Sequence, residues 1–275
     1  LTGSPQTAAV HLGRAISEPP SESERALVVV ELGRAEVRAG RFGEGLDHLN
    51  QSLDALTDPG MRMDAHRDRA FAAFASGGMD RARALVYGAL ADMDDRESVG
   101  ALQLEAALVM LAWLAGSDHE LDLKRHLDAT GESRAERTLL ALLSQERHAT
   151  GAHPDEVIDL ASRALGGGRM IAEDTSEALG WYMATYALLT CEAFDLARET
   201  IDQAIADGHR RCSSFARAGA LGCRSVLAIN EGRLLDAEAD ARASAEGGIP
   251  PIMVPVNASF QVRALSEQGR LDDAE

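Results

Sequence analysis

Two nearly identical heptads lie 37 residues apart in this chain, GRLLDAE at 232–238 and GRLDDAE at 269–275. A period of this length is typical of repeat proteins, in which one helical hairpin recurs along the chain. The alignment steps are 37, 37, 115, 40 and 37, and 115 corresponds to three units of about 38. Two degenerate copies are therefore expected near Gly116 and Gly151. The small residues on which the copies align are Ala8, Gly45, Ala82, Ala197, Ala237 and Ala274.

The repeating unit is predicted to be a pair of helices, here called A and B. Aromatic residues make up only 4% of the chain, and no alternating run long enough for a sheet occurs. The first A helix is expected to begin at a capping box formed by Ser21 and Glu24. The predicted pairs are 22–39 with 43–56, 61–76 with 79–92, 97–115 with 118–129, 133–149 with 154–165, 172–190 with 193–207, and 211–230 with 233–246, followed by a last A helix at 251–268.

The heptad has a physical role in each pair. Gly232 and Gly269 follow the last turn of an A helix, where a left-handed residue lets the chain reverse. Ala237 and Ala274 are expected where two helices approach closely, because a longer side chain there would push the helices apart. One hairpin cannot bury its own apolar face, so each pair depends on its neighbours.

The chain is predicted to form a single domain over 1–275, because no linker or shift of composition divides it. The repeat is strong over 3–92 and 172–275 and degenerate over 97–170. Neither end carries the polar outer face of a capping repeat. We therefore expect a fragment of a longer polypeptide, whose uncapped ends favour association with a second copy.

A family resemblance rests on two stretches at opposite ends of the chain. The run HLGRAISEPPSESERALVVVELGRAEVRAGRFGEGLDHLNQSL resembles the start of the helical-repeat region of actinobacterial LuxR-type large ATP-binding regulators, the group with MalT-like proteins. The stretch GRLLDAEADARASAEGGIPPIMVPVNASFQVRALSEQGRLDDAE is similar to the last repeats of that region. The resemblance implies an all-α, right-handed α-solenoid of tetratricopeptide-like helix-turn-helix repeats, with about seven units and half-repeats at both ends. It also implies an ATPase module before the repeats and a helix-turn-helix DNA-binding domain after them, so ATP would belong to the parent protein.

No catalytic, cofactor-binding or metal site is expected in this segment. The P-loop pattern G-x-x-x-x-G-K-[ST] does not occur, and LGGGRM at 165–170 is interpreted as a connection between helices. His119 and His126 lack the spacing of a metal-binding pair, and the three cysteines form no C-x-x-C motif. The net charge of −17 argues against direct nucleic-acid binding. No signal peptide or membrane span is visible, so a cytoplasmic protein is expected.

With no catalytic or metal site expected, the sequence favours a binding surface. In a solenoid the A helices line the concave face, so this surface is expected on them. Trp181 is predicted to pack inward, whereas Tyr182 and Tyr186 would face the groove, although aromatics at this spacing also suit a core. Arg34 and Arg263 would either meet an anionic group there or remain solvated.

Two functional hypotheses follow. The segment is either a sensor and interaction region of a LuxR-type regulator, binding a protein, a peptide or a small-molecule effector, or a free-standing scaffold or peptide-binding adaptor.

Overall fold

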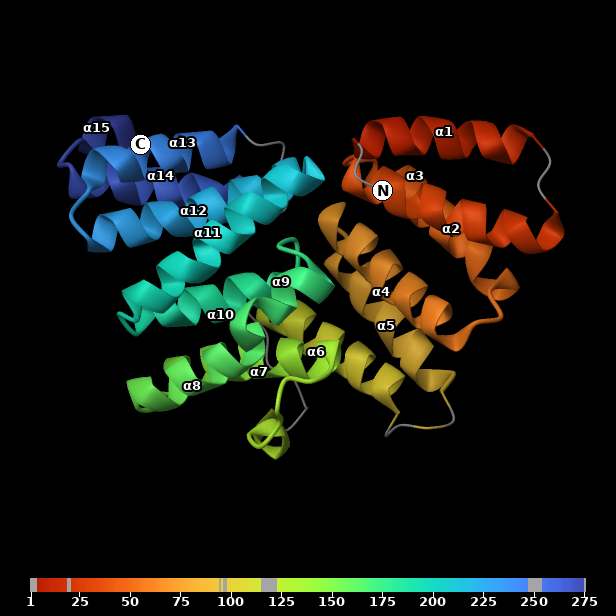
Figure 1. Ribbon diagram of the computed structural model, residues 1–275, viewed down its shortest axis with the longest axis horizontal. Coiled ribbons are helices and arrows are strands. Elements are labelled where there is room, and N and C mark those ends of the chain that lie inside the picture. Colours follow the sequence, from red (N-terminus) through yellow and green to blue (C-terminus); the bar gives the residue numbers. More distant parts are fainter. Residues whose placement is uncertain are drawn as a thin grey trace. The chain divides into compact units, whose positions relative to one another are not determined.

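The computed structural model describes residues 4–18, 21–93, 95, 98–114, 123–246 and 254–274. All regular structure in these residues is helical, which confirms the all-α prediction (Figure 1). Two compact units are present, Leu1–His119 with Pro250–Ile252 and Glu120–Ile249 with Met253–Glu275. None of the described helices combines the length and the apolar character that crossing a bilayer requires.

The first unit consists of helices that pack in chain order. Its elements are α1 (Pro5–Ser17), α2 (Glu22–Arg38), α3 (Phe42–Ser52), the 3₁₀ turn η1 (Leu53–Ala55), α4 (Pro59–Ala75), α5 (Met79–Ala91) and α6 (Val99–Leu114). The predicted capping box begins α2, since the Glu24 carboxylate accepts hydrogen bonds from the backbone N–H and the hydroxyl of Ser21.

The second unit continues the same pairwise packing. Its elements are the 3₁₀ turn η2 (Leu123–His126), α7 (Arg134–Ala149), α8 (Pro154–Leu165), the turn η3 (Gly166–Gly168), α9 (Arg169–Asp174), α10 (Leu179–Thr190), α11 (Phe194–Arg211), α12 (Ser214–Asn230), α13 (Leu234–Ala245), α14 (Val254–Glu267) and α15 (Leu271–Ala274).

One turn recurs at the six junctions between an A helix and its B helix that lie within the described residues. The central residue of the turn, i, has a positive φ. Its N–H donates to the carbonyl of residue i−3, and the N–H of residue i+1 donates to the carbonyl of residue i−4. At Gly232, for example, φ is 74°, and Arg233 N–H donates to Ala228 O at 2.8 Å. This arrangement satisfies carbonyls at the helix end and confirms the role predicted for the glycines. The turn occurs at Gly40, Gly77, Gly151, Glu192, Gly232 and Gly269.

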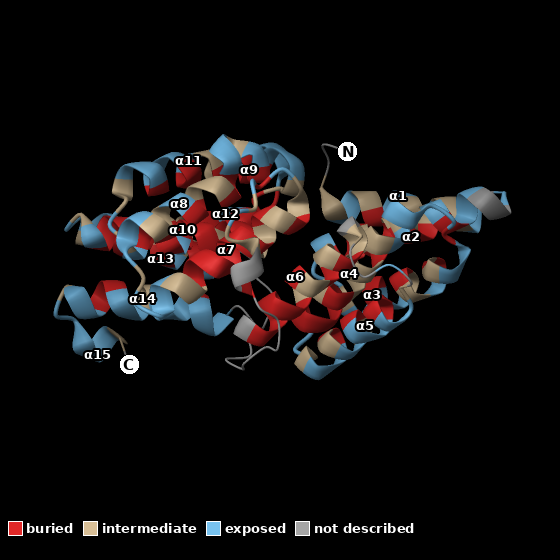
Figure 2. Ribbon diagram, turned by 90° about the horizontal axis from the view of Figure 1, so that it is seen from below, coloured by how far each residue is buried: buried red, intermediate tan, exposed pale blue. Residues whose placement is uncertain are grey.

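Each helix pair packs on the next pair within its unit. The A helices α2, α4 and α6 contact one another in succession, and α7, α10, α12 and α14 do the same in the second unit. Figure 2 shows buried residues on the faces where these helices meet. Ion pairs join neighbouring repeats: Arg137 Nε lies 3.0 Å from Asp174 Oδ2, and Arg34 Nε lies 2.7 Å from Asp68 Oδ2. Their partners are 37 and 34 residues apart, close to the spacing of the aligned copies.

Close helix contacts are made by small residues, as predicted. The B-helix alanines Ala82, Ala197 and Ala237 are fully buried. A Cβ on Gly45 would lie 2.8 Å from Gly33 O and 2.7 Å from a methyl of Val37, so α2 and α3 meet backbone to backbone. Three of the A-helix glycines, Gly100, Gly219 and Gly222, also form notches, which a side chain of the neighbouring A helix fills.

Two predicted helices are wrong in part. The helix expected over 172–190 is interrupted between α9 and α10, where Thr175 has a φ of 69°. The Ser176 N–H and hydroxyl there donate to Asp207 Oδ2 on α11, at 3.2 and 2.8 Å. The helix expected over 118–129 is not continuous either, because its described part contains only η2, and His119 lies outside the described residues.

Asp207 is a buried acceptor for several donors. Burial opposes its ionisation, but the hydrogen bonds from Ser176 and the ion pair with Arg211 outweigh burial and hold the pKa of the Asp207 carboxyl below its ordinary value. The charged form of Asp207 therefore stabilises the break that precedes α10.

Candidate functional site

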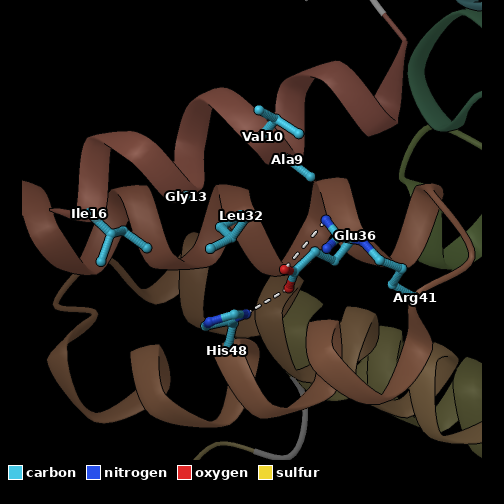
Figure 3. Close-up of a pocket in the computed structure, with 8 residues that line it drawn as sticks. All are labelled: Ala9, Val10, Gly13, Ile16, Leu32, Glu36, Arg41 and His48. Carbon is cyan, nitrogen blue, oxygen red and sulfur yellow. Dashed lines mark hydrogen bonds and ion pairs between the residues drawn. The ribbon is translucent and has the colours of Figure 1, made fainter.

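The first unit contains a pocket between α1, α2 and α3, with a volume of about 300 Å³. Most of its wall is apolar, and its polar groups come from α2, the following turn and α3 (Figure 3). This volume lies at the lower end of the range for small-molecule sites. The lining residues are Ala9, Val10, Gly13, Ile16, Leu32, Glu36, Arg41 and His48.

Helix geometry brings the polar residues together. Leu32 and Glu36 are four residues apart on α2 and therefore share one face. The left-handed turn at Gly40 reverses the chain, so Arg41 N–H donates to Glu36 O at 2.8 Å. His48 comes from α3, which packs directly against α2.

The Glu36 carboxylate is the centre of this group. Glu36 is only 3% exposed, and His48 Nδ1 lies 2.6 Å from its Oε2. Arg41 approaches Oε1 less closely, at 3.5 Å, and its other nitrogen bonds to Glu44 at 3.0 Å. Figure 3 shows the carboxylate between His48 and Arg41, on the side of α2 that carries Leu32. A buried charge requires such partners, because an unpaired carboxylate would be costly to desolvate.

The polar end of the pocket holds a carboxylate–imidazole pair. A carboxylate on Nδ1 orients an imidazole as it does in hydrolytic triads, and in the neutral ring it leaves Nε2 as an acceptor. None of the eight lining residues is Ser, Thr or Cys, so the lining places no hydroxyl or thiol nucleophile beside this pair. In the described stretches, no three His, Cys, Asp or Glu side chains converge to hold a metal ion.

The predicted aromatic cluster divides between core and surface. Trp181 is fully buried, and its Nε1 donates to Thr200 Oγ1 at 2.9 Å, which confirms the inward orientation. Tyr182 fills the Gly219 notch on α12, and its buried hydroxyl makes no hydrogen bond to the described protein atoms. Burial raises the pKa of Tyr182 well above its ordinary value. Tyr186 is 37% exposed on α10 and is therefore open to a partner.

The two predicted arginines lie in different surroundings. Arg34 donates to Glu31 and Asp68, each at 2.7 Å, and its side chain is only 15% exposed. Its charge is already compensated within the first unit. Arg263 is exposed on α14, with Asn230 Oδ1 at 3.5 Å, so its guanidinium is accessible to an anionic group.

The Glu36–His48 pair was not anticipated from the sequence. Two signals were available: a charged residue within the apolar stripe of α2, and the His-Leu dipeptide at 11–12 and 48–49, which recurs at one repeat length. Neither signal identifies the partner, because the contact joins two helices.

No protein-family model matches this chain, and no curated protein matches it either.

Proposed function

We propose that this chain is a non-catalytic binding module, built as a right-handed superhelix of tetratricopeptide-like repeats and serving as the sensor region of a LuxR-type ATP-dependent regulator. The observation that carries the binding role is the succession of A helices in each unit, α2 to α6 and α7 to α14, joined by one recurring turn. Arrays of this kind present long surfaces on which a partner contacts several repeats.

The resemblance supplies the regulatory part of the proposal. A protein, a peptide or a small-molecule effector would bind to the repeats and change how the flanking ATPase and DNA-binding domains are held. This mechanism requires the effector to favour one arrangement of the repeats over another. Tyr186 and Arg263 are exposed on A helices and are the candidate contacts for a protein partner.

The coding sequence on either side of this segment tests the regulatory proposal. We expect a P-loop motif upstream and a helix-turn-helix domain downstream. A gene with neither element would refute the regulator and leave a free-standing scaffold or peptide-binding adaptor. The binding role has its own test, in which Tyr186→Ala and Arg263→Ala should weaken capture of an identified partner while Leu235→Ala, which removes an exposed side chain on a B helix, should not.

A further inference from the structure

The pocket of the first unit combines an apolar wall with one buried carboxylate. Ala9, Ile16 and Leu32 supply aliphatic surface, and Glu36 lies at the polar end. A ligand that fits this combination has an aliphatic chain and a polar head. A pocket of about 300 Å³ has room for a small aliphatic molecule.

The charged groups around the pocket determine whether the polar head of the ligand is a cation or an anion. Glu36 and Arg41 line the pocket, 3.5 Å apart, and Arg41 pairs more closely, at 3.0 Å, with the carboxylate of Glu44 outside the lining. Leaving His48 aside, these groups therefore contain one more carboxylate than guanidinium. The chain as a whole has a net charge of −17, which further favours a cation over an anion.

The carboxylate also has hydrogen-bonding capacity left. His48 occupies Glu36 Oε2 at 2.6 Å, but the nearest Arg41 nitrogen is 3.5 Å from Oε1, beyond the distance of a good hydrogen bond. An ammonium group has three donors and a compact charge. It suits this oxygen better than the planar guanidinium of Arg41, which lies closer to Glu44.

We propose that this pocket binds a primary ammonium group carried on a short aliphatic chain. The ammonium pairs with Glu36 Oε1, and the chain lies against Leu32 and Ile16. Two sources share this chemistry, a free aliphatic amine and a lysine side chain of a peptide. The inference deepens the proposed function, since it names the class of ligand that such a sensor or adaptor would recognise.

Titrations of the ¹⁵N-labelled full chain, followed by NMR, test the proposal. The probes are butylammonium chloride for the free amine, N-acetyl-lysine N-methylamide for the peptide source, and sodium butyrate as an anion of similar size. We expect saturable shifts at Gly13 and Leu32 with a cation, in the millimolar range for so few ligand atoms, and none with butyrate. Saturation by butylammonium alone identifies a free amine, and saturation by the lysine derivative alone identifies a peptide. Failure of both cations, or equal binding of butyrate, overturns the proposal.

Two charge variants are expected to change the affinity in opposite directions. Glu36→Gln keeps the size of the side chain but removes its charge, so binding of the cation should weaken at least about tenfold. Arg41→Gln removes a competing cation from the same carboxylate, so binding should strengthen severalfold. If both variants changed affinity in the same direction, Glu36 would not be the ammonium acceptor.

A third variant blocks the pocket without touching its charges. A Cβ on Gly13 would meet no atom within 4 Å, so the side chain of Gly13→Leu can enter the pocket and displace the ligand. Gly88 on α5 is equally unobstructed but lies outside the pocket, so Gly88→Leu is the matched control. We expect Gly13→Leu to abolish binding and Gly88→Leu to preserve it, and unchanged binding to Gly13→Leu would refute this location. The flanking-gene test does not depend on either result.

Discussion

Gly219→Ala is expected to destabilise the second unit strongly, although alanine is the better helix former. An ideal Cβ on Gly219 would lie 1.6 Å from the Tyr182 hydroxyl oxygen and 2.2 Å from the ring carbon that bears it. The ring is also held edge to face against Trp181, with centroids 4.9 Å apart. Overpacking of this kind costs about 1–3 kcal/mol, whereas the gain in helix propensity is at most about 1 kcal/mol. Because this clash involves the rigid ring as well as the hydroxyl, we expect the upper part of the cost and a net loss of about 2 kcal/mol in the free energy of unfolding.

Urea unfolding monitored by far-UV circular dichroism measures this loss. A double-mutant cycle identifies its cause: Tyr182→Leu should remove most of the penalty of Gly219→Ala, but Tyr182→Phe should not, because the phenyl ring still occupies the notch. Gly88→Ala is the control, since its Cβ meets nothing within 4 Å, and we expect it to be neutral or stabilising. If Gly219→Ala were as stable as the natural chain, or if Tyr182→Phe rescued it fully, the proposed packing of α10 on α12 would be wrong.

Three further predictions concern backbone strain, thiol reactivity and pH. Glu192 has a φ of 58° where the other described turns have glycine, so Glu192→Gly should raise the melting temperature and Gly232→Ala should lower it, each by about 2–4 °C for a change of about 1 kcal/mol. Exposed Cys212 should react with a thiol reagent in the native chain, whereas burial raises the pKa of Cys223 to about 12 and should protect it until unfolding. The lowered pKa of Asp207 means that its carboxylate stabilises the fold above the ordinary Asp pKa of about 3.9 and that this stability is lost as the pH falls further. Asp207→Asn should therefore reduce the free energy of unfolding at pH 7. Urea titrations should also show that the free energy of unfolding of this variant falls less steeply as the pH is lowered.

Much of the fold follows from local chemistry that a sequence displays. The turns at Gly40 and Gly232 need a left-handed residue, and glycine at a fixed period marks them. Small residues such as Ala237 mark the close contacts because a larger side chain would not fit there. Trp181 is predictable as a core residue because it belongs to a helix whose sequence is almost entirely apolar. These features depend on a few adjacent residues, so one sequence is sufficient to predict them.

Other features depend on residues that meet only in the folded chain. The break before α10 is stabilised by Asp207, which lies 31 residues beyond Ser176 and would read as an ordinary helix surface residue. Tyr182 has a position that suits a groove, but the Gly219 notch on the next A helix encloses it. Glu36 similarly pairs with His48, which lies on another helix. Helical periodicity cannot encode such pairs, because it reports the face of a residue and not its partner.

The central claim is that successive helix pairs pack on each other through neighbouring A helices. Methyl NOEs in a ¹³C-labelled chain test it most directly, because they report apolar side chains that pack in contact. We predict NOEs linking α2 to α4, α7 to α10, α10 to α12 and α12 to α14, together with those inside each A–B pair. A map that lacked these A-to-A contacts, or that joined α7 directly to α14 in their place, would contradict the account.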